Sequence, residues 1–186
     1  SIGSFGFGTP NKGFEKLVSK VQDEFEEAVI RLNIPYADFG DTEGLNAKRI
    51  AEHCRHLINT PPIKLEITHE FLQDTELLDS LAANSMNVFM YEDKGGRGLS
   101  SALDMALAVN MPVAVSNCPM FRHLLNECPF VNADEYSLKK ILTHNIDDVN
   151  KISKDWNKEN LQWEYERVLN AIFNKVTNPV IEKKGI

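Results

Sequence analysis

Short apolar runs alternate along this chain with segments in which apolar residues recur every three or four positions. The apolar runs predict β-strands at 2–7, 28–32, 64–68, 86–91, 112–116 and 130–131. The helical spacing predicts α-helices at 14–25, 45–58, 100–109, 120–125, 138–142 and 147–173, and another that is capped by Asp74 or Thr75 and carries Leu77, Leu78 and Leu81. Strands and helices that alternate on this scale are typical of a parallel sheet covered on both faces. We therefore expect an α/β fold with a Rossmann-like, doubly wound parallel sheet, followed by C-terminal helices.

The last part of the chain is purely helical in its pattern. Ser137 is expected to cap the helix at 138–142, and the long helical region after it is expected to break near Asn157. Large apolar side chains recur along that region, at Trp156, Trp163, Tyr165, Leu169 and Phe173. Such a stripe more often packs on its own domain than on a partner. We therefore divide the chain into an α/β domain at 1–145 and a C-terminal helical extension at 146–186 that packs on it.

Composition and charge narrow the class of protein. The chain has 186 residues, of which 42% are hydrophobic and 25% charged, as in an ordinary globular domain. The net charge of -7 and the scattered basic residues argue against a nucleic-acid partner, which needs clustered lysine and arginine. No apolar run approaches the ~20 residues of a transmembrane helix, and no signal peptide is visible. The three cysteines are widely spaced, so we expect reduced thiols and a cytoplasmic location, with peripheral attachment to a membrane as the alternative.

A glycine-rich loop follows the first predicted strand, from Gly6 to Gly13. In an open parallel sheet, ligands bind where such loops lead from the carboxyl ends of strands into helices. Glycines allow a close approach of the backbone, and the free N–H groups at a helix start favour an anion, to which Lys12 adds a positive charge. The loop lacks the glycine spacing of dinucleotide-binding folds and the Gly-Lys-Ser/Thr ending of a P-loop. It therefore favours neither a dehydrogenase nor an ATPase.

A second glycine-rich loop, at 92–101, follows the most apolar predicted strand. Its glycines, Arg97, Ser100 and Ser101 all lie just before the helix at 100–109. A serine here can cap the helix, or a ligand oxyanion can take the same donors. Arg97 can bind a phosphate with two parallel hydrogen bonds. This loop is the best candidate for a phosphate site in the sequence.

The segment 98–116 resembles the signature of group 1 glycosyltransferases, which are GT-B enzymes of the retaining type. That family has a glycine-rich loop, a helix of the form Leu-Glu-Ala-Met-Ala, a short turn and then Pro-Val-Val; here Ala102 to Val115 follow this order. Upstream, the first strand and the pair Lys12-Gly13 resemble the family's opening strand and Lys-Gly pair. Phe71-Leu72 and the helix after them fit the segment between the two. The resemblance covers residues 1 to about 125.

The resemblance implies that the chain is the C-terminal, nucleotide-sugar-binding half of a GT-B enzyme. Lys12 would contact the diphosphate, the backbone near Phe71 and Leu72 would face the base, and Asp104 would accept the ribose hydroxyls. The candidate donor-binding residues are Gly6, Phe7, Gly8, Lys12, Gly13, Phe71, Leu72, Glu92, Arg97, Gly98, Leu99, Ser100, Ser101 and Asp104. The glycosyl group would pass to an acceptor held by an N-terminal domain of the same protein. A strand that begins almost at residue 1 fits the expectation that such a domain precedes this chain.

The resemblance also implies that no cofactor and no bound metal take part, and no Asp-x-Asp motif is present to hold a metal. The nucleoside-diphosphate sugar would be a substrate. No catalytic residue is assigned, because the donor domain alone is expected to be inactive without the domain that holds the acceptor.

The sequence departs from the family pattern at two places. Phe7 stands where the family has an arginine, and Gly96 stands where it has the first of two glutamates. Glu92 is the alternative for that glutamate if the loop is longer, and Arg97 can replace the lost cation. These departures leave two alternative functions open: a non-catalytic GT-B-like scaffold or partner-docking module, and a nucleotide-sugar epimerase of the same fold.

Overall fold

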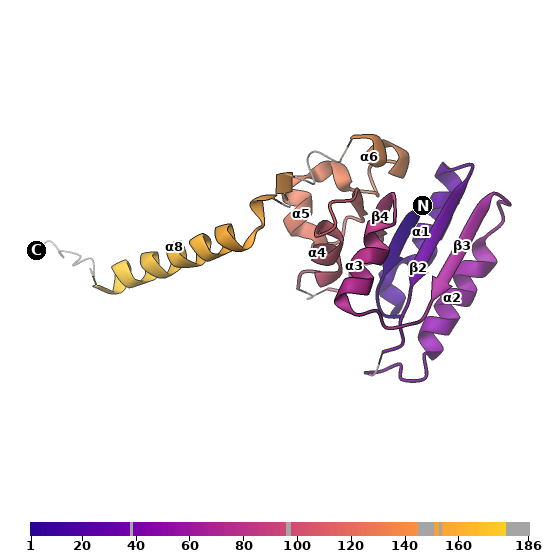
Figure 1. Cartoon of the computed structure of the whole chain (residues 1–186), viewed down its shortest axis with the longest axis horizontal. Helices are drawn as coiled ribbons and strands as arrows, with labels where there is room; N and C mark the ends of the chain where they lie inside the picture. The colour runs from indigo at the N-terminus through magenta and orange to yellow at the C-terminus, as the bar shows by residue number, and fades with distance from the viewer. Residues whose placement is uncertain (38, 96–97, 145–150, 153, 178–186) are drawn as a thin grey trace, which may run out of the picture. The chain divides into compact units, whose positions relative to one another are not determined.

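The sheet has five parallel strands in the order β3-β2-β1-β4-β5 (Figure 1). The computed structural model describes all residues except 38, 96–97, 145–150, 153 and 178–186. The strands are β1 (Ile2–Phe5), β2 (Ala28–Asn33), β3 (Ile63–Thr68), β4 (Met86–Phe89) and β5 (Val113–Val115). The central strand β1 pairs on one side with β2 and on the other with β4, and Ile2 lies opposite both Ile30 and Met86. The expected parallel α/β sheet is therefore confirmed.

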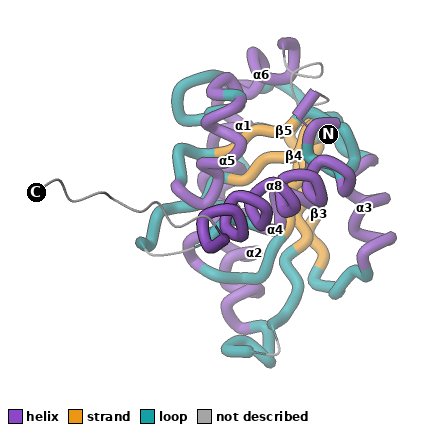
Figure 2. Tube along the Cα trace, turned by 90° about the vertical axis from the view of Figure 1, so that its left-hand side faces the viewer, coloured by secondary structure: helices purple, strands orange, loops and turns teal. Residues whose placement is uncertain are grey.

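Helices cover both faces of this sheet. α1 (Phe14–Glu24) and α2 (Leu45–Leu57) join strands that progress from β1 to β3, and they pack against each other. The chain then crosses back past β1, so that α3 (Asp74–Ala82) and α4 (Ser101–Leu107) connect strands in the opposite direction. Right-handed crossovers in opposite directions place their helices on opposite faces, and Figure 2 shows α3 across the strands from α1. The fold is doubly wound, as expected.

The core lies between the sheet and these helices because each element turns its apolar side inward. Phe14, Leu17, Val18 and Val21 recur at helical spacing along α1, and all four are buried. Burial of a side chain of this size contributes about 1.5–3 kcal/mol each. The same core cluster contains residues of the strands and of α2. The strand residues include Ile2, Ile30, Leu32, Met86 and Val88, and the α2 residues are Ala47, Ile50 and Cys54.

Three details of the expected elements are wrong. The segment 130–131 is no strand: it lies in a 3-10 helix, η3 (Pro129–Val131), in which the Val131 N–H donates to the Cys128 carbonyl at 3.3 Å. Proline has no N–H for a strand ladder and fits the first turn of a helix, which explains the difference. The helix expected at 120–125 is divided into η2 (Pro119–Phe121) and α5 (Arg122–Glu127). The N-cap residue of α3 is Gln73, which precedes both expected positions, Asp74 and Thr75.

One further helix lies where it was expected, and one was not expected. α6 (Leu138–His144) is capped as expected, since the Lys140 N–H donates to the Ser137 hydroxyl at 3.2 Å. A further 3-10 helix, η1 (Pro10–Lys12), lies inside the loop after β1.

The chain forms two compact units, Ser1–Asn150 and Lys151–Ile186. The second contains α8 (Lys158–Thr177), which follows a bend at 156–157. The expected break near Asn157 is confirmed, and the Asn157 side chain accepts the Asn160 N–H at 2.8 Å. Packing of this unit on the α/β domain stays a prediction. Within the described residues, no helix has the length and apolar character needed to cross a membrane.

Candidate ligand-binding site

A cavity of about 310 Å³ lies at the carboxyl ends of the central strands. The strand order reverses at β1, whose neighbours β2 and β4 lead to helices on opposite faces. In doubly wound sheets, ligands bind at this switch point, because the loops on either side of it separate. The cavity is lined by residues from the segments that follow all five strands: Phe5, Gly6, Phe7, Lys12, Asn33, Pro35, Phe71, Leu72, Asp74, Leu77, Leu99, Ser100, Ser101, Ala102, Met105 and Met120. Its volume is at the lower end of the range of ligand sites.

The loop after β1 owes its shape to glycines at points of close contact. Gly13 has φ +67°, and a Cβ atom there would lie 1.9 Å from the Met90 carbonyl oxygen, so only glycine fits. A Cβ atom on Gly8 would lie 2.5 Å from the Ala47 Cα atom. These two glycines allow the loop to pack closely against the end of β4 on one side and the first turn of α2 on the other.

The loops after β1 and β4 are bonded to each other. The Glu92 N–H donates to the Asn11 carbonyl at 2.9 Å, and the Lys12 Nζ donates to the Tyr91 hydroxyl at 2.8 Å. Tyr91 is buried, and this burial raises its pKa to about 12, although a hydrogen bond with Ser100 acts in the other direction. The phenol is therefore neutral at ordinary pH, and its oxygen accepts a hydrogen bond from the Lys12 ammonium group. The two glycine-rich loops predicted to bind phosphate thus form one structure, in which Tyr91 positions Lys12.

The second loop reaches the cavity through its last residues. Leu99 is half-exposed, while Ser100 is buried and precedes α4 as its N-cap residue. The Ser100 side chain makes no capping hydrogen bond to the helix, and its N–H donates to the Met120 carbonyl at 3.2 Å. Ser101 is exposed at the first position of α4. Arg97 lies outside the described residues.

The structure brings most of the candidate residues together. Those that line the cavity are Gly6, Phe7, Lys12, Phe71, Leu72, Leu99, Ser100 and Ser101. Gly8 and Gly13 shape the first loop from outside the lining, as described above. Glu92 is exposed and forms an ion pair with Lys94 at 3.3 Å, and a Cβ atom on Gly98 would meet only open space.

Asp104 is not among the lining residues, although Ala102 and Met105 on the same helix, α4, line the cavity. Its carboxylate is 3.6 Å from the Nε2 atom of His123 on α5. Burial lowers the pKa of His123, while Asp104 acts against this change. The ribose contact expected of Asp104 stays a prediction.

Several lining residues were not among the sequence candidates. Asn33 ends β2 as a polar residue after an apolar run, and that position was a usable signal, because side chains at a strand's carboxyl end face the ligand crevice. Asp74 was considered only as a helix cap. Met105, one helical turn after Ala102, and Met120, after β5, could not be placed at the cavity from local pattern alone.

Aromatic rings form the wall of the cavity around Phe7. The Phe7 ring is stacked on Phe71 with centroids 6.3 Å apart and meets Phe39 edge-on at 5.2 Å. Phe71, which lines the cavity together with Phe7, is 64% exposed, so its ring is open to a ligand. At the position where the resembling family has an arginine, this chain therefore has an apolar surface that suits a planar ring.

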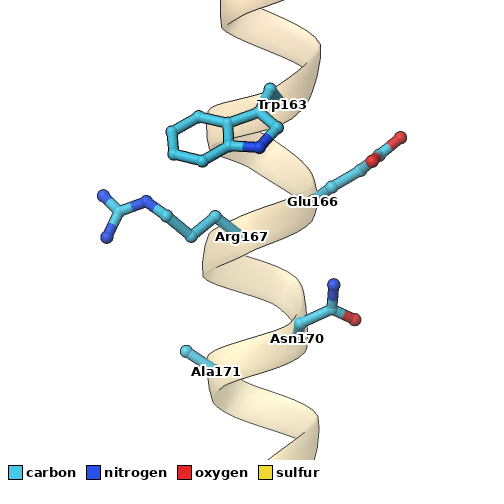
Figure 3. Close-up of a pocket in the computed structure, with 5 residues that line it drawn as sticks. All are labelled: Trp163, Glu166, Arg167, Asn170 and Ala171. Carbon is cyan, nitrogen blue, oxygen red and sulfur yellow. The ribbon is translucent and has the colours of Figure 1, made fainter.

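A separate hollow of about 420 Å³ lies on α8. All five of its lining residues belong to that one helix: Trp163, Glu166, Arg167, Asn170 and Ala171 (Figure 3). The Arg167 guanidinium lies 5.8 Å from the Trp163 ring centroid and pairs with Glu164. Because a single helix forms it, this hollow is a surface groove, and it does not enclose a ligand.

Comparison with solved structures shows which fold this is. The catalytic domain of cholesterol-alpha-glucosyltransferase from Helicobacter pylori matches with a TM-score of 0.54 and 15% identity, over 87% of this chain and 97% of that one. AviGT4, a glycosyltransferase involved in avilamycin A biosynthesis, matches with a TM-score of 0.56 and 14% identity, over 82% of this chain and 44% of that one. The alpha,alpha-trehalose 6-phosphate synthase from Burkholderia multivorans matches with a TM-score of 0.54 and 11% identity, over 87% of this chain and 38% of that one.

The chain has the Rossmann-like fold of a GT-B glycosyltransferase domain. It spans less than half of the length of the second and third of these proteins. No family model matches the sequence, and no curated protein matches it.

Proposed function

We propose that this domain binds a nucleoside-diphosphate sugar in the cavity between the loops after β1 and β4. In this proposal it is the donor half of a glycosyltransferase, and an N-terminal domain of the same protein holds the acceptor. The observation that carries the proposal is that two loops chosen from the sequence for phosphate binding line a single cavity at the switch point of the sheet. The GT-B fold supports the same function.

The chemistry of the β4 side of the cavity suits a diphosphate. Lys12 supplies a positive charge, and its hydrogen bond to the buried Tyr91 holds that charge at the cavity. Ser100 and Ser101 add hydroxyl donors beside the start of α4. A fixed ammonium group also stabilises the negative charge that develops on the departing diphosphate when a glycosyl bond breaks. No metal ion is required in this scheme.

One observation favours a second candidate function, a non-catalytic relative that keeps the nucleotide site. The Phe7 ring fills the place of the family's arginine and stacks on Phe71, so that a cation expected near the diphosphate is replaced by an apolar group. Such a protein would bind the nucleotide without transferring a sugar. An epimerase of the same fold would release the nucleotide without any acceptor, so analysis of the products distinguishes it from a transferase.

Isothermal titration with UDP and GDP tests the binding proposal on the chain of residues 1–186. We expect Lys12→Ala to weaken binding roughly 10- to 100-fold, because a hydrogen bond to a charged group contributes about 1.5–3 kcal/mol. Lys64→Ala is the matched control, since Lys64 is an exposed lysine near the amino end of β3. Arg97→Ala tests the second expected cation. If no nucleoside diphosphate binds, or if both lysine variants weaken binding equally, the proposal is wrong.

A further inference from the structure

We propose that the base of the bound nucleotide is guanine, and that Asn33 and Asp74 select it. This inference rests on the proposed function and adds the identity of the base. The strand order places β2 and β3 on one side of β1 and β4 on the other. Lys12, Ser100 and Ser101 gather on the β4 side, whereas Asn33 ends β2 and Asp74 follows β3. The cavity therefore offers a cation and hydroxyl groups on one side and hydrogen-bond acceptors on the other.

Asn33 presents an acceptor whose orientation is fixed. Its Nδ2 atom donates to the Thr68 hydroxyl at 2.9 Å and to the Glu70 carbonyl at 3.0 Å. Because a carbonyl oxygen can only accept, the amide group cannot be reversed, and Oδ1 is the atom left over. Asn33 is only 8% exposed and lines the cavity, and Oδ1 has no hydrogen bond within the part of the chain that the structure describes. This oxygen is not fully buried, so a donor on a ligand in the cavity can reach it.

Asp74 presents two more acceptors to the same cavity. It is the first residue of α3, and Leu77, one turn later, also lines the cavity, so both lie on the helix face that borders it. Among the described residues, the Asp74 carboxylate takes part in no ion pair or hydrogen bond, unlike Glu76 two residues later, which accepts the Gln73 N–H at 2.9 Å. Its two oxygens are therefore available to a ligand.

Three acceptor oxygens match the edge of guanine and of no other common base. Guanine carries three N–H bonds, one on N1 and two on the neighbouring amino group, so a carboxylate can accept two of them side by side. Uracil has one N–H bond between two carbonyl oxygens, which a carboxylate would repel. Adenine and cytosine place an unprotonated ring nitrogen beside their amino group, and its lone pair would face a carboxylate oxygen. A site that offers acceptors to a ligand in place of water favours the base whose N–H bonds match them over a base that leaves them unpaired.

The surfaces between these groups suit a planar base. Phe71 and Leu72 lie in the chain between the end of β3 and Asp74, and Phe7 is stacked on Phe71. A base that reaches Asp74 passes along this apolar wall, where stacking on an aromatic ring contributes to binding without selecting a base. The choice between bases therefore depends on hydrogen bonds to Asn33 and Asp74.

Titration of GDP, UDP, ADP and xanthosine diphosphate into the chain of residues 1–186 and its variants tests the inference. We expect GDP to bind at least 10-fold more tightly than UDP or ADP. Asp74→Asn should weaken GDP binding about 10-fold and leave UDP binding within twofold. The same variant should gain affinity for xanthosine diphosphate, because xanthine has a carbonyl oxygen where guanine has its amino group, and the new amide can donate to it. Asp79→Asn is the matched control, since Asp79 is exposed on the same helix but does not line the cavity.

The outcomes separate this inference from the function on which it rests. If UDP or ADP binds as tightly as GDP, or if Asp74→Asn weakens all nucleotides equally, guanine selection is wrong and the nucleotide site stands. If no nucleoside diphosphate binds to the unmodified chain, the proposed function is wrong, and the inference falls with it. The gain of xanthosine diphosphate binding cannot come from a misfolded variant, so this result supports the contact at Asp74 directly.

Discussion

Replacing Gly13 with alanine tests whether the loop after β1 is held against the end of β4. Gly13 has φ +67°, and its missing Cβ atom would lie 1.9 Å from the Met90 carbonyl oxygen. Gly95 has nearly the same φ, +69°, but a Cβ atom there would meet nothing within 4 Å. Gly95→Ala is therefore a control that introduces the same backbone strain without the collision.

The two substitutions should differ in the free energy of unfolding. Alanine in the left-handed region costs roughly 1 kcal/mol at either position. At position 13 the collision with Met90 forces the backbone to shift, which costs about 1–3 kcal/mol more, as overpacking does elsewhere. The effect of alanine on the unfolded chain is the same in both variants and cancels in the comparison. We therefore expect Gly13→Ala to be less stable than Gly95→Ala by about 1–3 kcal/mol.

Urea unfolding followed by far-ultraviolet circular dichroism measures this difference. This signal follows the helices and strands of the α/β domain directly, whereas both tryptophans, Trp156 and Trp163, belong to the unit Lys151–Ile186. If the two variants are equally stable, the close packing of Gly13 on Met90 is wrong, and with it the shape of the loop that carries Lys12.

Three further predictions concern ionisation. Burial raises the pKa of Tyr91 to about 12, so the folded state keeps its proton above pH 10, where the unfolded chain loses it. Stability should therefore fall by about 2 kcal/mol as the pH rises from 10 to 12. Urea unfolding of Tyr91→Phe at several pH values should show a shallower loss. Burial opposes ionisation of Asp134, but Lys16 and the Asn117 N–H, each at 2.8 Å, bring its pKa below the ordinary value. Its contribution to stability should be present at neutral pH and lost as the pH falls through that lowered pKa. The stability of Asp134→Asn should therefore depend less on pH below 4, and an unchanged dependence on pH would contradict the contact. All three thiols are buried, and burial raises the pKa of Cys54 to about 12. A disulfide-exchange reagent at pH 8 should therefore label the cysteines only after unfolding. Rapid labelling of the native chain would show that the thiols are accessible.

Much of the fold could be predicted because it depends on local pattern. The spacing of Phe14, Leu17 and Val21 predicts α1 and its buried face, and glycines after an apolar strand mark a loop that can approach a ligand. The two loops proposed to bind phosphate are predicted from such glycines. Their meeting at one cavity follows from the parallel sheet, since the carboxyl ends of neighbouring strands share an edge.

The other features depend on contacts between distant segments, which no local pattern records. The hydrogen bond from Lys12 to Tyr91 joins residues 79 positions apart. The role of Asn33 depends on partners in and after β3, Thr68 and Glu70, which use both of its N–H bonds. The segment 130–131 reads as a strand by its apolar character, but Pro129 and the turn at Cys128 favour a 3-10 helix.

A crystal structure of this chain with bound GDP would test the nucleotide site most directly. We predict that the diphosphate oxygens lie within hydrogen-bond distance, about 2.7–3.2 Å, of the Lys12 ammonium and of Ser100 or Ser101, with the base directed toward Asn33 and Asp74. GDP bound outside the cavity, or with its diphosphate on the Asp74 side and its base beside Lys12, would contradict the proposed site.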